Sequence, residues 1–179
     1  MNLRFEEFKD EIDTLVEFLT SGTWEFYGTP NPKSENIRAN YENQRYTGDD
    51  CKTFWVILDD NARAGMLRVY DLQDGTPLFD IRILSKYKGM GIGTNSVKWL
   101  VDYIFNNYPD KERFEANTRQ DNYAMRCVFN KCGFVKESHY RKGWECSDGR
   151  IYDAVGYAIT KEDWENKKIT PVNWNDFKC

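Results

Sequence analysis

Hydrophobic residues recur every three to four positions near the start of the chain. This spacing predicts an amphipathic helix over residues 9–20, preceded by a short strand over 3–8. A second helix with a weaker apolar stripe is predicted from Ser34, as its N-cap, to about residue 46. The loop between the helices, residues 23–32, reads TWEFYGTPNP, and its glycine and prolines break regular structure there.

The hydrophobic period then changes to short apolar runs bounded by turns, which is typical of strands. Three runs predict consecutive antiparallel strands over 53–60, 63–72 and 77–84. Apolar residues at i, i+3, i+4, i+7 and i+8 then predict a helix with the stripe Val97, Leu100, Val101, Ile104 and Phe105. A strand is then predicted over 113–119 and a helix over 122–133. A hairpin with strands over 134–145 and 150–159 follows, and a last short helix over 161–167. The helix over 122–133 is predicted to bury Met125, Val128, Phe129 and Cys132.

The alternation of strands and helices in the second half of the chain determines the predicted fold class. Strand–helix–strand units predict an α/β (α+β) fold, in which a parallel or mixed sheet has helices on both faces. A chain of 179 residues fits one domain, which we expect to span residues 1–179.

Composition and charge argue against several classes of protein. The net charge of −4 and the pI near 5.2 disfavour binding to nucleic acid through phosphate neutralisation. The five cysteines are scattered and His139 is the only histidine, so neither a metal site nor a disulfide framework is expected. The N-terminus is acidic where a signal peptide needs an apolar core, and no apolar run reaches the roughly 20 residues that cross a bilayer. We therefore expect a soluble cytoplasmic protein without membrane or nucleic-acid partners.

The segment KGMGIGTN, residues 88–95, lies between a predicted strand and the start of a predicted helix. A helix N-terminus has unpaired N–H groups that attract anions, and glycines let the backbone approach a phosphate closely. Lys88 adds a positive charge. The alternating glycines match neither the dinucleotide-binding fingerprint G-x-G-x-x-G nor the phosphate loop that ends in G-K-[ST]. A tight left-handed turn without a ligand is the alternative interpretation.

Two motifs resemble those of the GNAT (Gcn5-related) N-acetyltransferase family. KGMGIG, residues 88–93, is similar to the family's pyrophosphate loop [QR]-x-x-G-x-[GA], with lysine at the first position. NYAMRCVFNKCGF, residues 122–134, matches the later motif N-x-x-[AS]-x-x-x-[YF]-x-x-x-G-F. The ending GRIYDAVGYAITKEDWE resembles the branch of ribosomal-protein alanine acetyltransferases. The resemblance implies the family's mixed, mostly antiparallel sheet.

The resemblance also implies that acetyl-CoA binds where the strands that carry Ile83 and Asn117 diverge. It assigns to the cofactor Ile81, Arg82, Ile83, Lys88, Gly89, Met90, Gly91, Ile92, Gly93, Thr94, Asn117, Asn122 and Phe129. Backbone N–H groups of the loop would hold the pyrophosphate, and the strand backbone would hold the pantetheine amides. Asn122 can equally serve only as the N-cap of its helix. Phe129 replaces a tyrosine that protonates the departing thiolate in many relatives, so water, Tyr123 or Tyr140 would have to do so here.

The implied reaction is acetyl transfer to an amine, which must lose a proton to attack. Asp80 is the candidate base, and the alternative is a structural ion pair with Arg82, which lies on the same strand face. Glu25 and Asp153 are further candidates, whereas His139 is not expected to act.

The acceptor site is predicted from the aromatic loop, the second helix and the final hairpin. Its residues are Trp24, Glu25, Tyr27 and Asp153. The N-terminus of a peptide or protein, a polyamine and an aminoglycoside all fit an acidic, aromatic site. A non-catalytic acyl-CoA sensor on the same fold is the competing function. We expect a monomer or homodimer.

Overall fold

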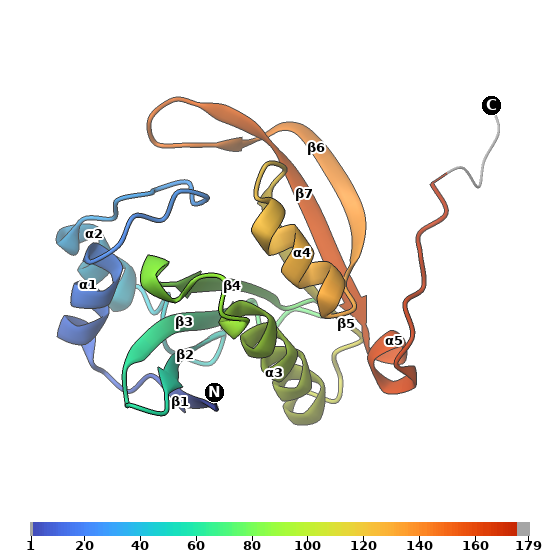
Figure 1. Ribbon diagram of the computed structural model, residues 1–179, viewed down its shortest axis with the longest axis horizontal. Coiled ribbons are helices and arrows are strands. Elements are labelled where there is room, and N and C mark those ends of the chain that lie inside the picture. The colour runs from blue at the N-terminus through green and yellow to red at the C-terminus, as the bar shows by residue number, and fades with distance from the viewer. Residues whose placement is uncertain (1, 175–179) are drawn as a thin grey trace.

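Seven strands form one sheet in the order β1-β2-β3-β4-β5-β7-β6 (Figure 1). The structure is a computed structural model that describes residues 2–174. The strands are β1 Leu3–Glu7, β2 Cys51–Leu58, β3 Arg63–Tyr70, β4 Leu78–Ile83, β5 Arg113–Arg119, β6 Val135–Glu145 and β7 Ile151–Thr160. All neighbours pair antiparallel except β4 and β5, which run parallel. The predicted mixed, mostly antiparallel sheet is confirmed.

Helices cover both faces of this sheet, as predicted. They are α1 Ile12–Thr20, α2 Ser34–Glu42, the 3₁₀-helix η1 Ser85–Tyr87, α3 Ile92–Asn107, α4 Tyr123–Lys131 and α5 Lys161–Asn166. Apolar residues of α1 and α2 pack on one face, against Trp55, Ile57 and Met66. Apolar residues of α3 and α4 pack on the other face, in the larger core around Phe79 and Phe114. None of the helices in residues 2–174 is long and apolar enough to cross a membrane.

Both N-terminal helices are shorter than predicted. α1 begins at Ile12 because Asp10 has a φ of +50°, which is not helical. α2 ends at Glu42, since Gln44 has a φ of +55°. The prediction that Ser34 caps α2 is wrong, because Lys33 holds the N-cap position and no side chain bonds there.

The sheet opens between β4 and β5. Leu78 and Glu115 are the one registered pair between these strands, and the Glu115 N–H donates to the Pro77 carbonyl at 3.1 Å. On its other side β4 stays paired with β3 up to Leu84, whose N–H donates to the Ala64 carbonyl at 2.9 Å. Backbone groups alternate in direction along a strand. Ile81 and Ile83 therefore direct their N–H and C=O groups into the opening, whereas those of Arg82 face β3.

Candidate active site

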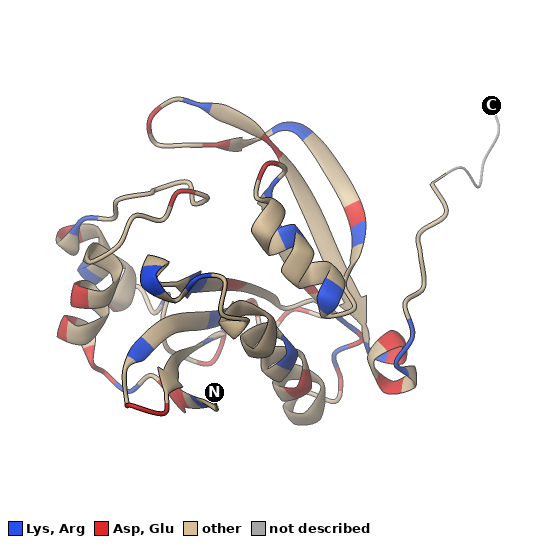
Figure 2. Cartoon of the chain, viewed as in Figure 1, with Lys and Arg blue, Asp and Glu red and all other residues tan. Residues whose placement is uncertain are grey.

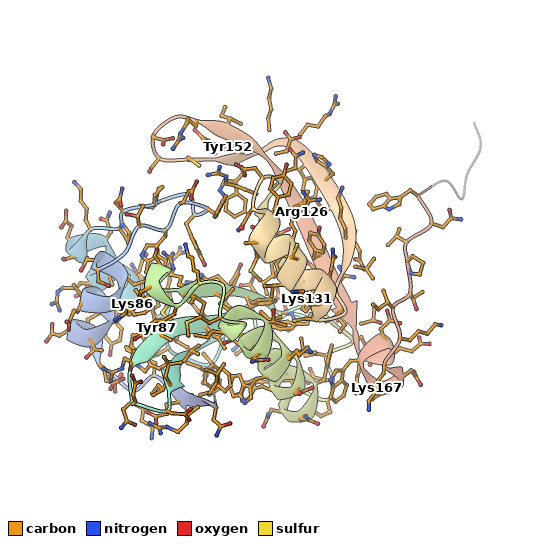
Figure 3. The ribbon with its side chains drawn as sticks, in the orientation of Figure 1. Lys86, Tyr87, Arg126, Lys131, Tyr152 and Lys167 are labelled. Atoms are coloured by element: carbon orange, nitrogen blue, oxygen red, sulfur yellow. The ribbon has the colours of Figure 1, made fainter. Side chains whose placement is uncertain are left out.

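A cavity of about 690 Å³ lies where β4 and β5 diverge. Figure 3 shows Lys86 and Tyr87 of η1 on one side of this region and Arg126 and Lys131 of α4 on the other. The predicted site residues that line the cavity are Trp24, Glu25, Tyr27, Asp80, Ile81, Arg82, Ile83, Lys88, Gly89, Gly91, Ile92, Gly93, Thr94, Asn117, Asn122 and Phe129. The fold therefore brings together residues from five separate segments of the chain.

Two predicted site residues do not line this cavity. Met90 points into solvent, with 53% of its surface exposed. Asp153 is bound within the β6–β7 hairpin, where it contacts His139 Nε2 at 2.8 Å and accepts from the Lys142 N–H at 2.8 Å. The hydrogen bond from the Lys142 N–H, followed in size by the one with His139, lowers the pKa of the Asp153 carboxyl. The structure therefore places both residues away from the predicted site.

The glycine segment forms one end of the cavity. Gly89 and Gly91 have φ values of +80° and +79°, which favour glycine, and a Cβ added at either position would meet no atom within 4 Å. The first N–H bonded in α3 is that of Asn95, which donates to the Gly91 carbonyl at 3.1 Å. Within the described part of the chain, the N–H groups of residues 89–94 have no acceptor. The segment is thus a set of free donors that face open space.

Two lysines flank this end of the cavity. Figure 2 shows Lys and Arg both on the segment that leads into α3 and on α4. Lys88 precedes the glycines, and Lys131, in the last turn of α4, lines the same cavity. Sequence reasoning missed Lys131. The signal was its position within the 122–134 motif, at the end of the helix that this motif predicts. Free N–H groups and two ammonium groups together make this end suited to an anion.

One face of α4 forms a side wall rather than buried core. Of its predicted stripe only Phe129 is fully buried, whereas Met125, Val128 and Cys132 are partly exposed. Met125 and Val128 line the cavity, which explains the exposure that the pattern did not predict. Phe129 packs against Tyr157 at 4.8 Å and Phe134 at 5.6 Å between ring centroids. Its role in the core is confirmed by these contacts.

Asn122 starts α4 as an N-cap. Its Oδ1 accepts from the Met125 N–H at 3.2 Å, and its Nδ2 donates to Thr118 Oγ1 at 3.0 Å. The capping interpretation is confirmed. The side chain also lines the cavity, so a contact with a ligand remains a prediction.

Asp80 lies at the other end of the cavity and pairs with Arg68, not with Arg82. Arg68 Nη2 is 2.7 Å from Asp80 Oδ2, because the two residues are directly opposite on β3 and β4. Neighbours two positions apart on one strand are farther from each other. The other carboxylate oxygen, Oδ1, is buried and has no hydrogen-bond partner among the described residues. The alternative interpretation, a structural pair with Arg82, is therefore wrong as to the partner, and sequence reasoning missed Arg68.

Arg82 is held between two aromatic rings of the 23–32 loop. Its guanidinium carbon lies 5.2 Å from the Trp24 ring centroid and 3.8 Å from that of Tyr27. The Tyr27 hydroxyl donates to the Ile81 carbonyl. Burial raises the pKa of Tyr27, so this hydroxyl stays protonated near neutral pH. Loop and strand thus form one wall.

Backbone contacts fix the same loop at its other side. Arg119, itself buried, donates from Nη1 to the Glu25 carbonyl at 2.9 Å. The Ser147 N–H donates to the Gly28 carbonyl at 2.8 Å, which attaches the loop to the β6–β7 turn. The Glu25 side chain is left to line the cavity. We conclude that this end of the cavity is pre-formed.

The hydroxyl groups predicted for the reaction are not at the cavity. Tyr123 and Tyr140 are 67% and 59% exposed and do not line it. Residues that line it without having been predicted include Tyr70, Cys127 and Trp144. Tyr70 and Trp144 lie on strands, and nothing in their local sequence distinguishes them, because only the pairing of distant strands brings them here. Cys127 lies on α4, beside the stripe that was predicted to be buried.

The family model described as the acetyltransferase (GNAT) domain matches residues 2–135. The putative ribosomal N-acetyltransferase YdaF of Bacillus subtilis (strain 168) is 27% identical over 180 residues, which cover 94% of this chain and 95% of that protein.

Solved structures agree in fold. Spermidine N-acetyltransferase from Vibrio cholerae, in complex with CoA and spermine, superimposes with a TM-score of 0.78 at 16% identity, over 92% of this chain and 98% of that one. RimL, a ribosomal L7/L12 alpha-N-protein acetyltransferase in complex with CoA, gives a TM-score of 0.75 at 18% identity, over 89% and 94% of the two chains. The match of the family model to most of the sequence decides the classification: the chain belongs to the GNAT acetyltransferase family.

Proposed function

We propose that this chain, acting as one domain over residues 1–179, transfers the acetyl group of acetyl-CoA to a primary amine at the Asp80 end of the cavity. The observation that carries the proposal is the cavity itself, which joins free N–H donors at the start of α3 to a carboxylate on β4. An anionic cofactor and a basic acceptor can therefore meet inside one site.

Acetyl-CoA supplies the acetyl group as a thioester. The N–H groups of residues 89–94, with Lys88 and Lys131, are suited to its phosphates. The opening beside β4 suits the pantetheine amides, because the N–H of Ile81 and both backbone groups of Ile83 have no partner there among the described residues. Apolar Met125 and Val128 line the opposite side. The residues present fit the cofactor.

Asp80 is the proposed proton acceptor. Its unpaired Oδ1 can accept a hydrogen bond from the amine, while Arg68 holds Oδ2 and fixes the orientation of the carboxylate. As the amine nitrogen bonds to the thioester carbon and the carbon–sulfur bond breaks, Oδ1 takes the amine proton. A thiol with a pKa near 8.5 leaves as thiolate without great cost, which makes the absence of a tyrosine at Phe129 tolerable.

An α-amine is the favoured acceptor among the three considered. An α-amine has a pKa near 7.8 against about 10.4 for a lysine-like amine, so a larger fraction is unprotonated at neutral pH. The acceptor end holds Glu25 and Asp80 against Arg68 and Arg82, which is too little negative charge for a polycation. The names of YdaF and RimL point in the same direction, whereas the Vibrio cholerae neighbour is a polyamine enzyme.

The proposal is tested by thiol release from acetyl-CoA with a panel of amines. We expect release that depends on amine concentration, with α-amines preferred over spermidine and aminoglycosides. Calorimetry with CoA runs in parallel. Tight CoA binding without turnover of any amine would instead identify an acyl-CoA sensor, and absence of CoA binding would exclude both functions.

Labelling of Cys127 tests the location of the cofactor without relying on catalysis. Cys127 is exposed and lines the cavity, whereas Cys51, Cys132 and Cys146 are less accessible. Burial raises the pKa of Cys51 and Cys132 to about 11, so roughly one in a thousand of these thiols is ionised at pH 8. With Cys179 replaced by serine, because it lies outside the described residues, one cysteine should react quickly with N-ethylmaleimide.

Acetyl-CoA at ten times its Kd should slow that reaction about tenfold, since only free protein is labelled. The variant Cys127→Ala is the matched control and should show no fast phase. Equal labelling rates with and without acetyl-CoA would place the cofactor elsewhere.

We further propose a cytoplasmic monomer or homodimer. The Vibrio cholerae spermidine enzyme has a dodecameric structure, but the similarity of 15% identity carries only the fold. Sedimentation velocity would decide, and a dodecamer would contradict this assignment.

A further inference from the structure

Arg82 has no acidic partner although it lies in a confined site. Among the described residues it forms no ion pair, and none of its guanidinium nitrogens has a hydrogen-bond acceptor. Nε and Nη1 are buried without a hydrogen-bond partner, whereas Nη2 is not among the buried nitrogens and is the one left for the cavity that Arg82 lines. Nη2 can therefore donate a single charge-assisted hydrogen bond to a carboxylate.

Arg68 shows the contrast on the adjacent strand. Its Nη2 pairs with Asp80, and its Nη1 donates to the Arg45 carbonyl at 3.1 Å. Both arginines line the same cavity and stack on aromatic rings, but only Arg68 has its charge compensated by the protein. The uncompensated charge of Arg82 is therefore a property of this position and not of the cavity as a whole.

Further unpaired groups gather at this end. Asp80 Oδ1 is a buried acceptor without a donor, and Trp144 Nε1 is a buried donor without an acceptor. Asp80 and Arg82 are two positions apart on β4, so their side chains leave the same face of the sheet about 6–7 Å apart. One free acceptor beside free donors complements a molecule that has an amino group and an acidic group close together.

We propose that the acceptor is an amine with a carboxylate within a few bonds of the amino group, and that Arg82 binds this carboxylate. The inference rests on the proposed function and specifies its substrate. Asp80 receives the amine and Arg82 the carboxylate, and the rings of Trp24 and Tyr27 hold the guanidinium in place. The carboxylate belongs either to a free amino acid or to an acidic side chain at the N-terminus of a peptide.

A polyamine fits this arrangement poorly. Its second ammonium group would approach the uncompensated guanidinium, and two like charges at such distances repel strongly in a site of low polarity. A carboxylate instead gains a charge-assisted hydrogen bond with Arg82. This corresponds to about a 10- to 100-fold preference over the matched amine that lacks the carboxylate.

The test compares amines that differ only in the carboxylate. Phenylalanine is compared with phenethylamine, and the C-terminally amidated peptide Glu-Ala with Gln-Ala. For the wild type we expect kcat/KM to favour the carboxylate member of at least one pair by about 10- to 100-fold, through KM. The pair that shows the preference identifies the source of the carboxylate. In Arg82→Gln this ratio should fall towards one, and Arg82→Lys should restore it only in part.

Lys88→Gln is the matched control, because it removes a cation from the opposite end of the same cavity. It should weaken CoA binding and keep the ratio between paired amines. Retained CoA binding by Arg82→Gln shows that this variant is folded. A ratio near one in the wild type, a ratio unchanged in Arg82→Gln, or a preference for spermidine would overturn the proposal.

A second readout separates this proposal from the proposed function. Both amine pairs are titrated calorimetrically into the protein saturated with CoA. If no amine is acetylated, the proposed function fails, while tighter binding of the carboxylate member of either pair that depends on Arg82 still supports the carboxylate site. Equal or absent binding within both pairs overturns it.

Discussion

Replacing Gly91 with aspartate is expected to abolish most CoA binding. Gly91 has a φ of +79°, a conformation in which asparagine and aspartate are the best tolerated alternatives to glycine. The start of α3 should therefore survive either change. Asparagine adds bulk where N–H groups must approach a phosphate, and we expect about a tenfold loss of affinity. Aspartate adds a negative charge whose repulsion of the CoA phosphates costs about 1–3 kcal/mol, so we expect roughly a further 10- to 100-fold loss of CoA affinity.

Calorimetric titration with CoA at low and high salt measures both variants. The difference between aspartate and asparagine should shrink at high salt, because salt screens the added repulsion. Gly149→Asp is the matched control, since Gly149 has a φ of +81° and equally open surroundings but lies in the β6–β7 turn. Unchanged affinity in folded Gly91→Asp would refute the assignment of the loop.

The second large effect is expected at Asp80. Asp80→Asn should lower turnover by about 100- to 1,000-fold, because the amine then loses its proton acceptor. CoA affinity should persist, since Asp80 lies at the end of the cavity away from the glycine segment. The remaining activity should rise with pH up to about pH 8, where an α-amine is unprotonated in solution. Steady-state kinetics from pH 6 to 9 measure this.

A purely structural role of Asp80 predicts a different pattern. Breaking the pair with Arg68 leaves a partly buried charge without its partner, which lowers the free energy of unfolding. The double variant Arg68→Gln/Asp80→Asn has no such charge and should regain stability in urea denaturation. If Asp80 accepts the proton, turnover of the double variant stays low. Recovery of turnover together with stability would show that Asp80 only positions Arg68.

Local patterns predicted the order of the elements and the glycine segment at one end of the cavity, although α1 and α2 are shorter than predicted and Lys131 was missed. The glycines that precede α3 present consecutive backbone N–H groups, so their geometry is encoded within a few residues. The stripe of α4 was predicted as core because apolar side chains look alike whether they face other side chains or a ligand. Partial exposure of Met125 and Val128 becomes visible only once β4 and β5 are seen to diverge.

The acceptor end could not be predicted to the same extent. The partner of Asp80 is decided by the register between β3 and β4, which places Arg68 opposite it. The surroundings of Arg82 depend on a loop more than fifty residues earlier in the chain, which the Tyr27 hydroxyl and Arg119 hold against the sheet. Such contacts join distant segments, and periodicity within one segment contains no information about them.

Direct transfer requires that one cavity bring acetyl-CoA and an amine together. Mass spectrometry of the products formed from acetyl-CoA labelled in the acetyl group tests this requirement, with phenylalanine or a peptide α-amine as acceptor. We expect the label in an amide of the added amine, in equal amount to the CoA released, and we expect Asp80→Asn to slow its formation. Label recovered only as acetate, at a rate independent of the amine, would show that no acetyl group is transferred to the amine.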